Sequence, residues 1–280
     1  MPTITRFAPS PTGHLHLGHA YSALFSAERA DQAGGDFLLR IEDIDQGRCR
    51  EEFEQAIYDD LGWLGLTWRH PVRRQSEHMD AYQKALEQLQ GNGLLYPCFC
   101  TRREIAVEIA AAGHAPHGPD GALYPGTCAR LSAEQRTARI AEGQHYALRL
   151  DMNKACRRVD TLTWHDAIKG KIVATPEIFG DVVLARKDVP TSYHLAVTHD
   201  DHLQGITLVT RGDDLFQATH VHRLLQALLD LDTPDYHHHH LLTDNSGKRF
   251  AKRDQALTLS YLRESGRSPE EVFRMIEWKV

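Results

Sequence analysis

Residues Arg6 to His19 read Arg-Phe-Ala-Pro-Ser-Pro-Thr-Gly-His-Leu-His-Leu-Gly-His, which is the pattern of a short strand, a Pro/Gly turn and a helix start. The first N–H groups of a helix have no partner within the helix. Together with the positive end of the helix dipole, they attract phosphates. His16 and His19 are three residues apart, so they project from one face of the first turn. The segment therefore predicts a nucleotide site.

Strand and helix signals alternate along the 280 residues, which predicts an α/β fold with a doubly wound, Rossmann-like parallel sheet. The expected strands cover residues 3–8, 36–42, 205–211 and 239–243, and the expected helices cover 15–32, 50–64, 76–90 and 215–231. In between, cysteines, Gly/Pro turns and short strands near 146–150, 159–164 and 182–184 predict an inserted mixed α+β module. The expected division is a first half of the Rossmann-like domain (1–95), the module (96–190), the second half (191–243), and a basic loop with short helices (244–280).

Composition limits the function classes. The chain is 41% hydrophobic and 25% charged with a formal net charge of −6, which excludes a generally basic nucleic-acid coat but not a local basic face. No apolar run reaches membrane-spanning length, and the N-terminus lacks the apolar core of a signal peptide, so no membrane partner is expected. Five cysteines are too few, and odd in number, for a disulfide framework. We expect a cytoplasmic monomer.

A second element with phosphate chemistry lies far along the chain, in the basic segment Lys-Arg-Phe-Ala-Lys-Arg at 248–253. Taken singly, the histidine pair fits a solvated helix start and the basic segment fits a solvated charge run. Loops at the carboxyl ends of parallel strands converge on one crevice, however. The two elements are therefore expected to face one ligand.

The two elements resemble the paired motifs of the class I aminoacyl-tRNA synthetases. His16-Leu17-Gly18-His19 resembles the HIGH motif, and residues 249–253 resemble the KMSKS motif. The block at 6–13 is similar to the glutamyl/glutaminyl branch in particular, and the resemblance covers nearly the whole chain. Supporting stretches lie at 40–43, 96–101, 193–197 and 205–215.

The resemblance implies an ATP site. Its catalytic residues would be His16, His19 and Lys252, which stabilise charge on the phosphates and on the leaving pyrophosphate. Gly18 would leave room for the adenine, and Mg²⁺ would accompany the ATP. The implied ATP-binding set is Pro9, His16, Gly18, His19, Arg249 and Lys252. Two departures from the KMSKS pattern are Arg249 in place of the first lysine and Ala251 in place of the serine.

The amino-acid pocket follows from charge. Glutamate has two carboxylates and one ammonium group, so a selective site needs two cations and one anion, which Arg6, Glu42 and Arg211 could supply. Each of the three would otherwise be an ordinary ion pair at a strand end. His194 stands where the relatives usually have glutamine, so the resemblance does not specify that wall of the pocket. The resemblance implies the glutamate-binding set Arg6, Phe7, Ala8, Pro9, Ser10, Glu42, Tyr193 and Arg211.

Three thiols within about 30 residues, Cys98, Cys100 and Cys128, suit one structural zinc ion. The small glutamyl-Q group of the family has a tyrosine four residues before the last cysteine, and Tyr124 matches that spacing. His114 and His117 are competing ligands. The alternative is a set of reduced structural thiols with no metal. The run of four histidines at 237–240 cannot all bind a metal from one strand, because alternate residues face opposite sides, and we expect a strand end with two inward histidines.

Only 27 residues follow Arg253, which is too short for the anticodon-binding region of a full glutamyl-tRNA synthetase. This plan resembles the glutamyl-Q group, whose members activate L-glutamate with ATP and pass it to queuosine in the anticodon loop of tRNA(Asp). The resemblance thus implies ATP, L-glutamate and queuosine-containing tRNA(Asp) as partners. Two alternatives remain: the catalytic fragment of an ordinary glutamyl- or glutaminyl-tRNA synthetase, and an inactive paralogue that binds tRNA or glutamate.

Overall fold

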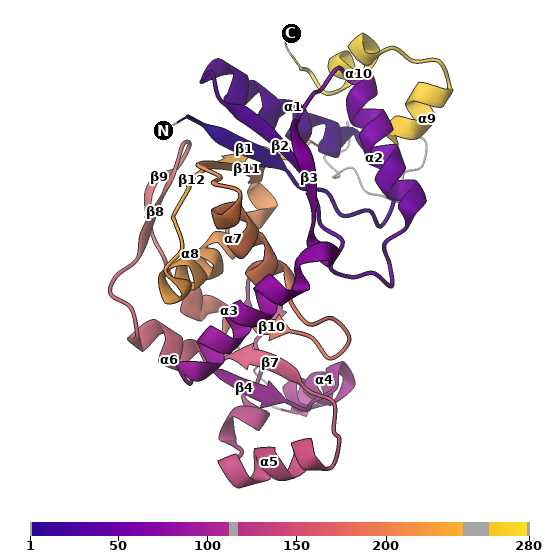
Figure 1. Ribbon diagram of the computed structural model, residues 1–280. Coiled ribbons are helices and arrows are strands. Elements are labelled where there is room, and N and C mark those ends of the chain that lie inside the picture. The colour runs from indigo at the N-terminus through magenta and orange to yellow at the C-terminus, as the bar shows by residue number, and fades with distance from the viewer. Residues whose placement is uncertain (1, 112–116, 243–257, 279–280) are drawn as a thin grey trace.

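Two parallel sheets that meet edge to edge form the centre of the computed structural model, which describes residues 2–111, 117–242 and 258–278 (Figure 1). The first sheet has the order β1-β2-β3 and is parallel throughout. In the second, β11, β12 and β8 are parallel and β9 is antiparallel to β8. Their bounds are β1 Ile4–Phe7, β2 Asp36–Ile41, β3 Arg69–Arg74, β8 Thr163–Asp166, β9 Gly170–Val173, β11 Leu208–Gly212 and β12 Asp235–His239.

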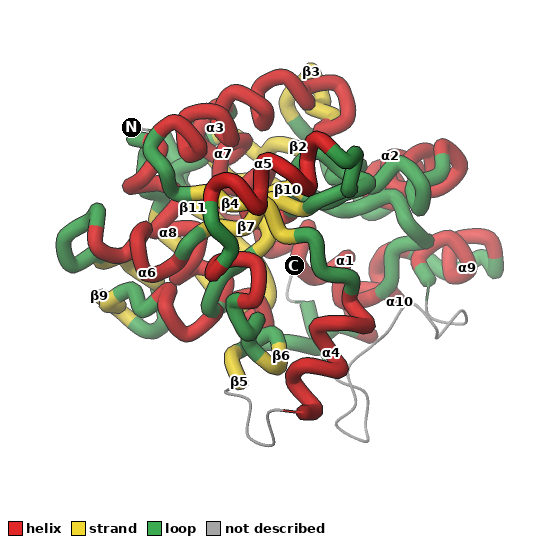
Figure 2. The backbone as a smooth tube through the Cα atoms, turned by 90° about the horizontal axis from the view of Figure 1, so that it is seen from below, coloured by secondary structure: helices red, strands yellow, loops and turns green. Residues whose placement is uncertain are grey.

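The sheets join between β1 and the start of β11, where the N–H of Thr207 donates to the carbonyl of Ile4 at 3.0 Å. Helices connect the parallel strands and surround them, as Figure 2 shows from below. The connecting helices are α1 Leu17–Gln32, α2 Glu51–Trp63 and α8 Ala218–Leu229, and two further helices, α3 Met79–Gly91 and α7 Tyr193–Leu203, also pack against this region. The predicted α/β class with a parallel sheet is confirmed.

An antiparallel sheet with its own small helices forms the lower part of the molecule in Figure 1. Its elements are β4 Leu95–Cys98, β7 Ala147–Leu150, β10 Val183–Ala185, the two-stranded pair β5 His117–Gly118 and β6 Gly121–Ala122, and the helices α4 Arg102–Ala111, α5 Ala133–Ala141 and α6 Met152–Arg157. β8 and β9 lie within 96–190 but join the central sheet through β12. The division of the chain at 95, 190 and 243 stays a prediction.

The last two helices, α9 Leu259–Glu264 and α10 Pro269–Met275, pack on the first part of the chain. Leu259, Leu262, Val272 and Ile276 share one buried cluster with residues of α1, β2 and α2. None of the helices in the described ranges has the length and apolar character needed to cross a bilayer.

Several elements differ from the sequence predictions. The strand expected at 239–243 lies four residues earlier, at Asp235–His239, and the strand expected at 159–164 lies at Thr163–Asp166. β3 was not predicted, because its sequence Arg-His-Pro-Val-Arg-Arg has no apolar run. The helix expected from 76 begins at Met79, after a 3₁₀ turn at Gln75–His78.

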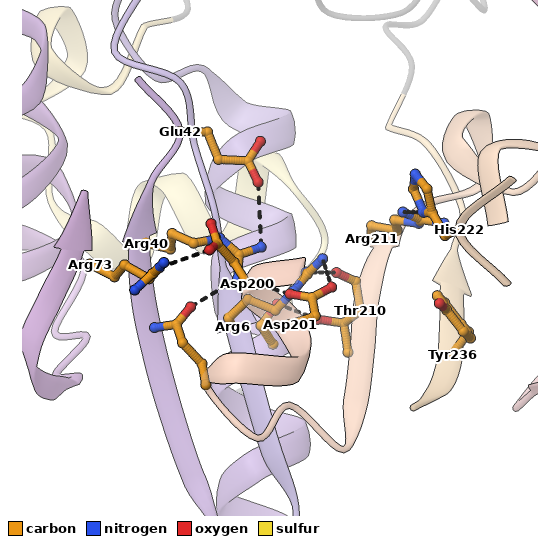
Figure 3. A network of polar contacts seen from close by, with 12 residues as sticks. Arg6, Arg40, Glu42, Arg73, Asp200, Asp201, Thr210, Arg211, His222 and Tyr236 are labelled. Atoms are coloured by element: carbon orange, nitrogen blue, oxygen red, sulfur yellow. Dashed lines mark hydrogen bonds and ion pairs between the residues drawn. The ribbon is translucent and has the colours of Figure 1, made fainter. Parts of the chain in front are cut away.

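A buried ion network fastens α7 to the first sheet (Figure 3). The strands β1, β2 and β3 each contribute one arginine, and α7 contributes two consecutive aspartates. Arg6 Nε and Arg40 Nη1 each lie 2.9 Å from Asp201 Oδ1, and Arg73 Nε lies 2.9 Å from Asp200 Oδ1. The side chains of Arg40 and Asp200 are both fully buried, so each needs the other members of the network.

Replacing Arg40 with methionine tests this dependence. The change leaves Asp200 and Asp201 short of compensating charge in the interior, so we expect a loss of about 3–5 kcal/mol in the free energy of unfolding. Urea unfolding monitored by circular dichroism measures it. The matched control is Arg69→Met, because Arg69 forms an exposed pair with Asp36 at 3.0 Å, for which a loss of about 0–1 kcal/mol is expected. Equal losses in the two variants would contradict a structural role for the buried network.

Candidate active site

A cavity of about 520 Å³ opens at the carboxyl ends of β1 and β11, where the two sheets meet. This is the place where ligands bind in doubly wound folds, because the loops after the two strands diverge there. The structure brings together nine of the predicted site residues in its lining: Arg6, Phe7, Ala8, His16, Gly18, His19, Glu42, Tyr193 and Arg211. Phe7 and Ala8 come from the end of β1, and Arg211 comes from the end of β11.

The two histidines of the helix start cap α1 reciprocally. His16 Nδ1 accepts the N–H of Gly18 at 3.1 Å, and His19 Nδ1 accepts the N–H of His16 at 3.1 Å. Because both Nδ1 atoms accept hydrogen bonds, the neutral rings carry their protons on Nε2. Gly18 packs against the first ring, and a Cβ at that position would lie 3.0 Å from Cε1 of His16. The helix start thus offers two imidazole N–H donors as well as its backbone dipole.

Described residues on both sides of positions 243–257 lie at this cavity or contact its lining. Leu242, the last described residue before these positions, lines the cavity. On the other side Thr258 forms a β-bridge with His16, and the N–H of Leu259 donates to the carbonyl of Leu15 at 2.8 Å. Arg249, Ala251 and Lys252 lie outside the described residues.

The charged wall of the cavity contains Arg6, Glu42 and Tyr193. Arg6 is held by Asp201 and by the carbonyl of Thr210, which accepts from Nη1 at 3.2 Å. Burial raises the pKa of Asp201, but Arg6 and Arg40 outweigh it and bring that pKa below its usual range. Burial raises the pKa of Glu42, and the nearby arginines oppose this rise. Burial also raises the pKa of the Tyr193 phenol, so this side chain stays a neutral hydrogen-bonding group.

Pro9 and Ser10 stand apart from the cavity lining. The carbonyl of Pro9 accepts the N–H of Glu42 at 2.9 Å, and the carbonyl of Ser10 accepts the N–H of Thr12 at 2.8 Å. These contacts shape the turn between β1 and α1 and place the backbone of Glu42 beside it. A direct role of Pro9 and Ser10 in binding stays a prediction.

Arg211 is a buried cation with neutral neighbours (Figure 3). It donates to His222, His238 and Thr219, and none of the described carboxylates forms an ion pair with it. The histidines stay neutral because burial and the charge of Arg211 lower their pKa values, that of His238 to about 4. His194 continues this arrangement, since its Nδ1 lies 3.1 Å from His222 Nε2.

The charges of the site can be counted. The buried network beside the cavity contains three arginines and three carboxylates, which balance one another in formal charge: Arg6, Arg40, Arg73, Glu42, Asp200 and Asp201. Outside this network, Arg211 and the carboxylate of Asp214 also line the cavity. Because Arg211 forms no ion pair with a described carboxylate, a ligand carboxylate would compensate its charge.

The predicted thiols also come together. The sulfur atoms of Cys98, Cys100 and Cys128 lie within 4.8 Å of one another. The phenol oxygen of Tyr124 is 3.4 Å from Cys98 Sγ and 3.6 Å from Cys100 Sγ. Sulfur atoms around tetrahedral zinc lie roughly 3.8 Å apart, given Zn–S bonds of about 2.3 Å, so the four groups fit such an ion. His117 is not part of the cluster, and His114 lies outside the described residues.

Sequence reasoning missed other residues of the cavity. Tyr21 lies three residues after Gly18 and Ser22 three residues after His19, so the helical spacing could have identified both. His239 accepts the hydroxyl of Ser22 at 2.8 Å, since its Nδ1 is committed to the carbonyl of His240. The histidine run therefore has two buried members, as predicted, but they are the neighbours His238 and His239, because both faces of β12 are covered.

Comparisons with known proteins agree with this geometry. Residues 3–278 match the family model described as tRNA synthetases class I (E and Q), catalytic domain. A glutamyl-Q tRNA(Asp) synthetase of Rhodobacter capsulatus is 49% identical over 278 residues, which are 98% of this chain and 99% of the relative. One from Symbiobacterium thermophilum is 42% identical, with 95% and 83% covered. The crystal structure of a glutamate-tRNA synthetase from Elizabethkingia anophelis superposes with a TM-score of 0.81 at 28% identity. It covers 99% of this chain, which spans only 61% of that protein.

The buried histidines predict a pH dependence of stability. Burial, and then Arg211, lower the pKa of His194 from 6.5 to about 4, so the unfolded chain binds more protons between these values. The stabilising contribution is complete above pH 6.5 and is lost as the pH falls toward 4, with about 2 kcal/mol lost at pH 5. The test compares urea unfolding of the wild type and His194→Asn at pH 7.5 and pH 5. The variant should lose about 2 kcal/mol less than the wild type between these pH values.

The control is His145→Asn, because His145 is exposed and should leave the pH dependence unchanged. If His194→Asn has the same pH dependence as the wild type, His194 is not held neutral by its surroundings.

Proposed function

Because the chain belongs to the family of class I tRNA synthetases (E and Q), catalytic domain, we propose that it activates L-glutamate with ATP and transfers it to queuosine in tRNA(Asp). The observation that carries the proposal is the cavity itself. It has imidazole donors at the start of α1 and, in its lining, a buried guanidinium with no carboxylate partner among the described residues. These two features suit the phosphates of ATP and a carboxylate of the amino acid.

In the activation step the α-carboxylate of glutamate attacks the α-phosphate of ATP, which forms a mixed anhydride and releases pyrophosphate. The Nε2–H groups of His16 and His19 would donate to the phosphate oxygens as negative charge develops. Lys252 would hold the leaving pyrophosphate, a role supported by Leu242 in the cavity lining and by the β-bridge between Thr258 and His16. Mg²⁺ bound with ATP would neutralise phosphate charge.

Glutamate would be held by the charged wall. Glu42 would accept from its ammonium group, while Arg6 and Tyr193 would border it. The α-carboxylate must reach the phosphates, so the buried Arg211 is left for the side-chain carboxylate. The side-chain carboxylate of glutamate would supply the charged partner that Arg211 lacks among the described carboxylates. Glutamine lacks that charge and would leave Arg211 uncompensated.

In the transfer step a hydroxyl of the queuosine ring attacks the acyl carbon of the mixed anhydride, and AMP leaves. We expect positioning of the acceptor hydroxyl against the mixed anhydride to contribute most to this step. We propose queuosine in tRNA(Asp) as the acceptor because relatives that match this chain over most of their length bear the name glutamyl-Q tRNA(Asp) synthetase. Charging of a tRNA 3′ end and binding without catalysis are the competing outcomes.

A structural zinc ion is proposed at Cys98, Cys100, Cys128 and Tyr124. Zinc bound to three thiolates and a phenolate would leave a net negative charge, and two arginines lie close enough to offset it. Arg149 stacks over the Tyr124 ring at 3.9 Å, and Arg136 donates to the carbonyl of Cys128 at 3.3 Å. The ion would join β4 to the turn at Thr127–Arg130 and so stabilise the lower part of the molecule.

The acceptor is tested by incubating the protein with ATP, radiolabelled glutamate and tRNA(Asp) with or without queuosine. We expect label only on queuosine-containing tRNA, and after ribonuclease digestion the label should lie on the anticodon-loop fragment and not on the 3′-terminal nucleotide. Lys252→Ala should lower glutamate-dependent pyrophosphate exchange at least a hundredfold, whereas the exposed control Lys154→Ala should not. Label at the 3′ end would support ordinary charging, and no exchange in the wild type would support a binding protein.

The zinc proposal predicts one zinc ion per chain by mass spectrometry of the purified protein. Cys128→Ser should lose the ion and unfold at a lower temperature, because the metal stabilises the folded state. Tyr124→Phe should keep the three thiolates and bind zinc more weakly in a chelator titration. Cys156→Ser is the control, since Cys156 lies outside the cluster. Metal-free wild-type protein with the stability of the zinc-loaded form would overturn the proposal.

A further inference from the structure

Arg211 is fixed by three hydrogen bonds. Its Nε donates to His238 Nε2 at 3.1 Å, Nη1 donates to His222 Nδ1 at 3.2 Å, and Nη2 donates to Thr219 Oγ1 at 2.6 Å. A guanidinium has five N–H donors, so these bonds leave one N–H on each terminal nitrogen. That pair matches the two oxygen atoms of a carboxylate. The orientation of Arg211 therefore decides whether a ligand carboxylate meets both donors.

The bond to His238 depends on the tautomer of that histidine. A guanidinium can only donate, so His238 Nε2 must be unprotonated, and the ring carries its proton on Nδ1. Asp166 selects this tautomer, because its Oδ2 lies 2.7 Å from His238 Nδ1. Both side chains are fully buried, and His238 stays neutral because burial, followed by the charge of Arg211, lowers its pKa to about 4.

Asp166 is itself held rigidly at the end of β8. Its Oδ1 accepts the N–H groups of Ile168 and Lys169, each at 2.9 Å, and its Oδ2 accepts the N–H of His238 at 3.2 Å. Burial raises the pKa of Asp166, but the hydrogen bond from the His238 side chain and these backbone bonds outweigh it and bring that pKa below its usual value, so the carboxylate stays charged. The histidine run and the hairpin between β8 and β9 thus meet at one buried contact.

We propose that Asp166 and His238 are positioning residues that hold Arg211 in the orientation that selects a substrate with a side-chain carboxylate. This inference rests on the proposed function, in which the cavity takes glutamate. Neither residue is part of the cavity lining, so both would act through Arg211.

The imidazole between the two charges has a specific effect. A direct pair between Asp166 and Arg211 would satisfy the guanidinium and remove its need for a substrate carboxylate. With His238 in between, Asp166 still fixes the orientation of Arg211, while the positive charge of Arg211 remains available to a substrate carboxylate. The second contact, His222, leads to the neutral His194 and supplies no competing carboxylate either.

The test measures glutamate-dependent ATP–pyrophosphate exchange, with and without tRNA, for variants of this pair. Asp166→Asn would favour the tautomer of His238 that is protonated on Nε2. The N–H groups of His238 Nε2 and Arg211 Nε would then face each other, and neither could accept. His238→Leu removes the acceptor, and His238→Gln can restore one. We expect Asp166→Asn and His238→Leu to raise KM for glutamate at least tenfold with KM for ATP within twofold. The preference for glutamate over glutamine should fall by the same factor, and His238→Gln should recover part of it.

The controls are His237→Gln, from the same histidine run, and Asp235→Asn, whose side chain is exposed on the same strand; both should stay within twofold of the wild type. Folded Asp166→Asn and His238→Leu proteins with wild-type KM for glutamate and wild-type preference would overturn the proposal.

A second measurement needs no destabilising variant. The imidazole ¹⁵N spectrum of the wild type, with His238 assigned by its absence in His238→Gln, should show a protonated Nδ1 and an unprotonated Nε2. A protonated Nε2 would refute the proposed hydrogen bond from Arg211 to His238, even if catalysis is normal. If the wild type shows no glutamate-dependent exchange, the proposed function fails, whereas an active wild type with unaffected variants rejects only the positioning role.

Discussion

Arg40 is fully buried on β2, and a guanidinium there requires carboxylates that its own strand cannot supply in sufficient number. Asp200 and Asp201 of α7 meet this requirement, and through the same two residues α7 also binds Arg6 and Arg73. The helix that carries the network begins at Tyr193, so its placement also sets the wall of the cavity. The carboxylates of this network are paired with its own arginines, and Arg211 lies outside it without an ion pair to a described carboxylate.

Local patterns predicted the elements that form the cavity. The apolar strands near residues 4–7 and 36–41, and the histidines at the start of α1, could be read directly because each signal lies within a few residues. The thiol cluster was also predictable, because the spacing of its cysteines is specific and Tyr124 lies four residues before Cys128. Arg6, Glu42 and Arg211 all line the cavity, as their positions at or near strands led us to expect, while their role in binding glutamate stays a prediction.

The partners of these residues were not predictable. Asp201 lies 195 residues from Arg6, and nothing in its local sequence distinguishes it from a solvated acid at the end of a helix. The histidine run was a similar case. Four consecutive imidazoles look polar, so the strand was expected to begin at residue 239, whereas Tyr236, His238 and His239 are buried between covered faces of the sheet. Burial of polar groups depends on partners from distant elements, and only the three-dimensional structure identifies them.

The reciprocal capping of α1 limits which residues the helix start can tolerate. Aspartate is among the best N-cap residues and could replace His16 as an acceptor for the helix N–H groups. It would, however, place a negative charge where the helix dipole and the cavity favour an anion. An imidazole meets both needs, because one nitrogen accepts from the backbone while the other presents a proton to the ligand. Aspartate, although favoured at such a cap for stability alone, is therefore unsuited to this site, and His16 and His19 combine two tasks that aspartate cannot.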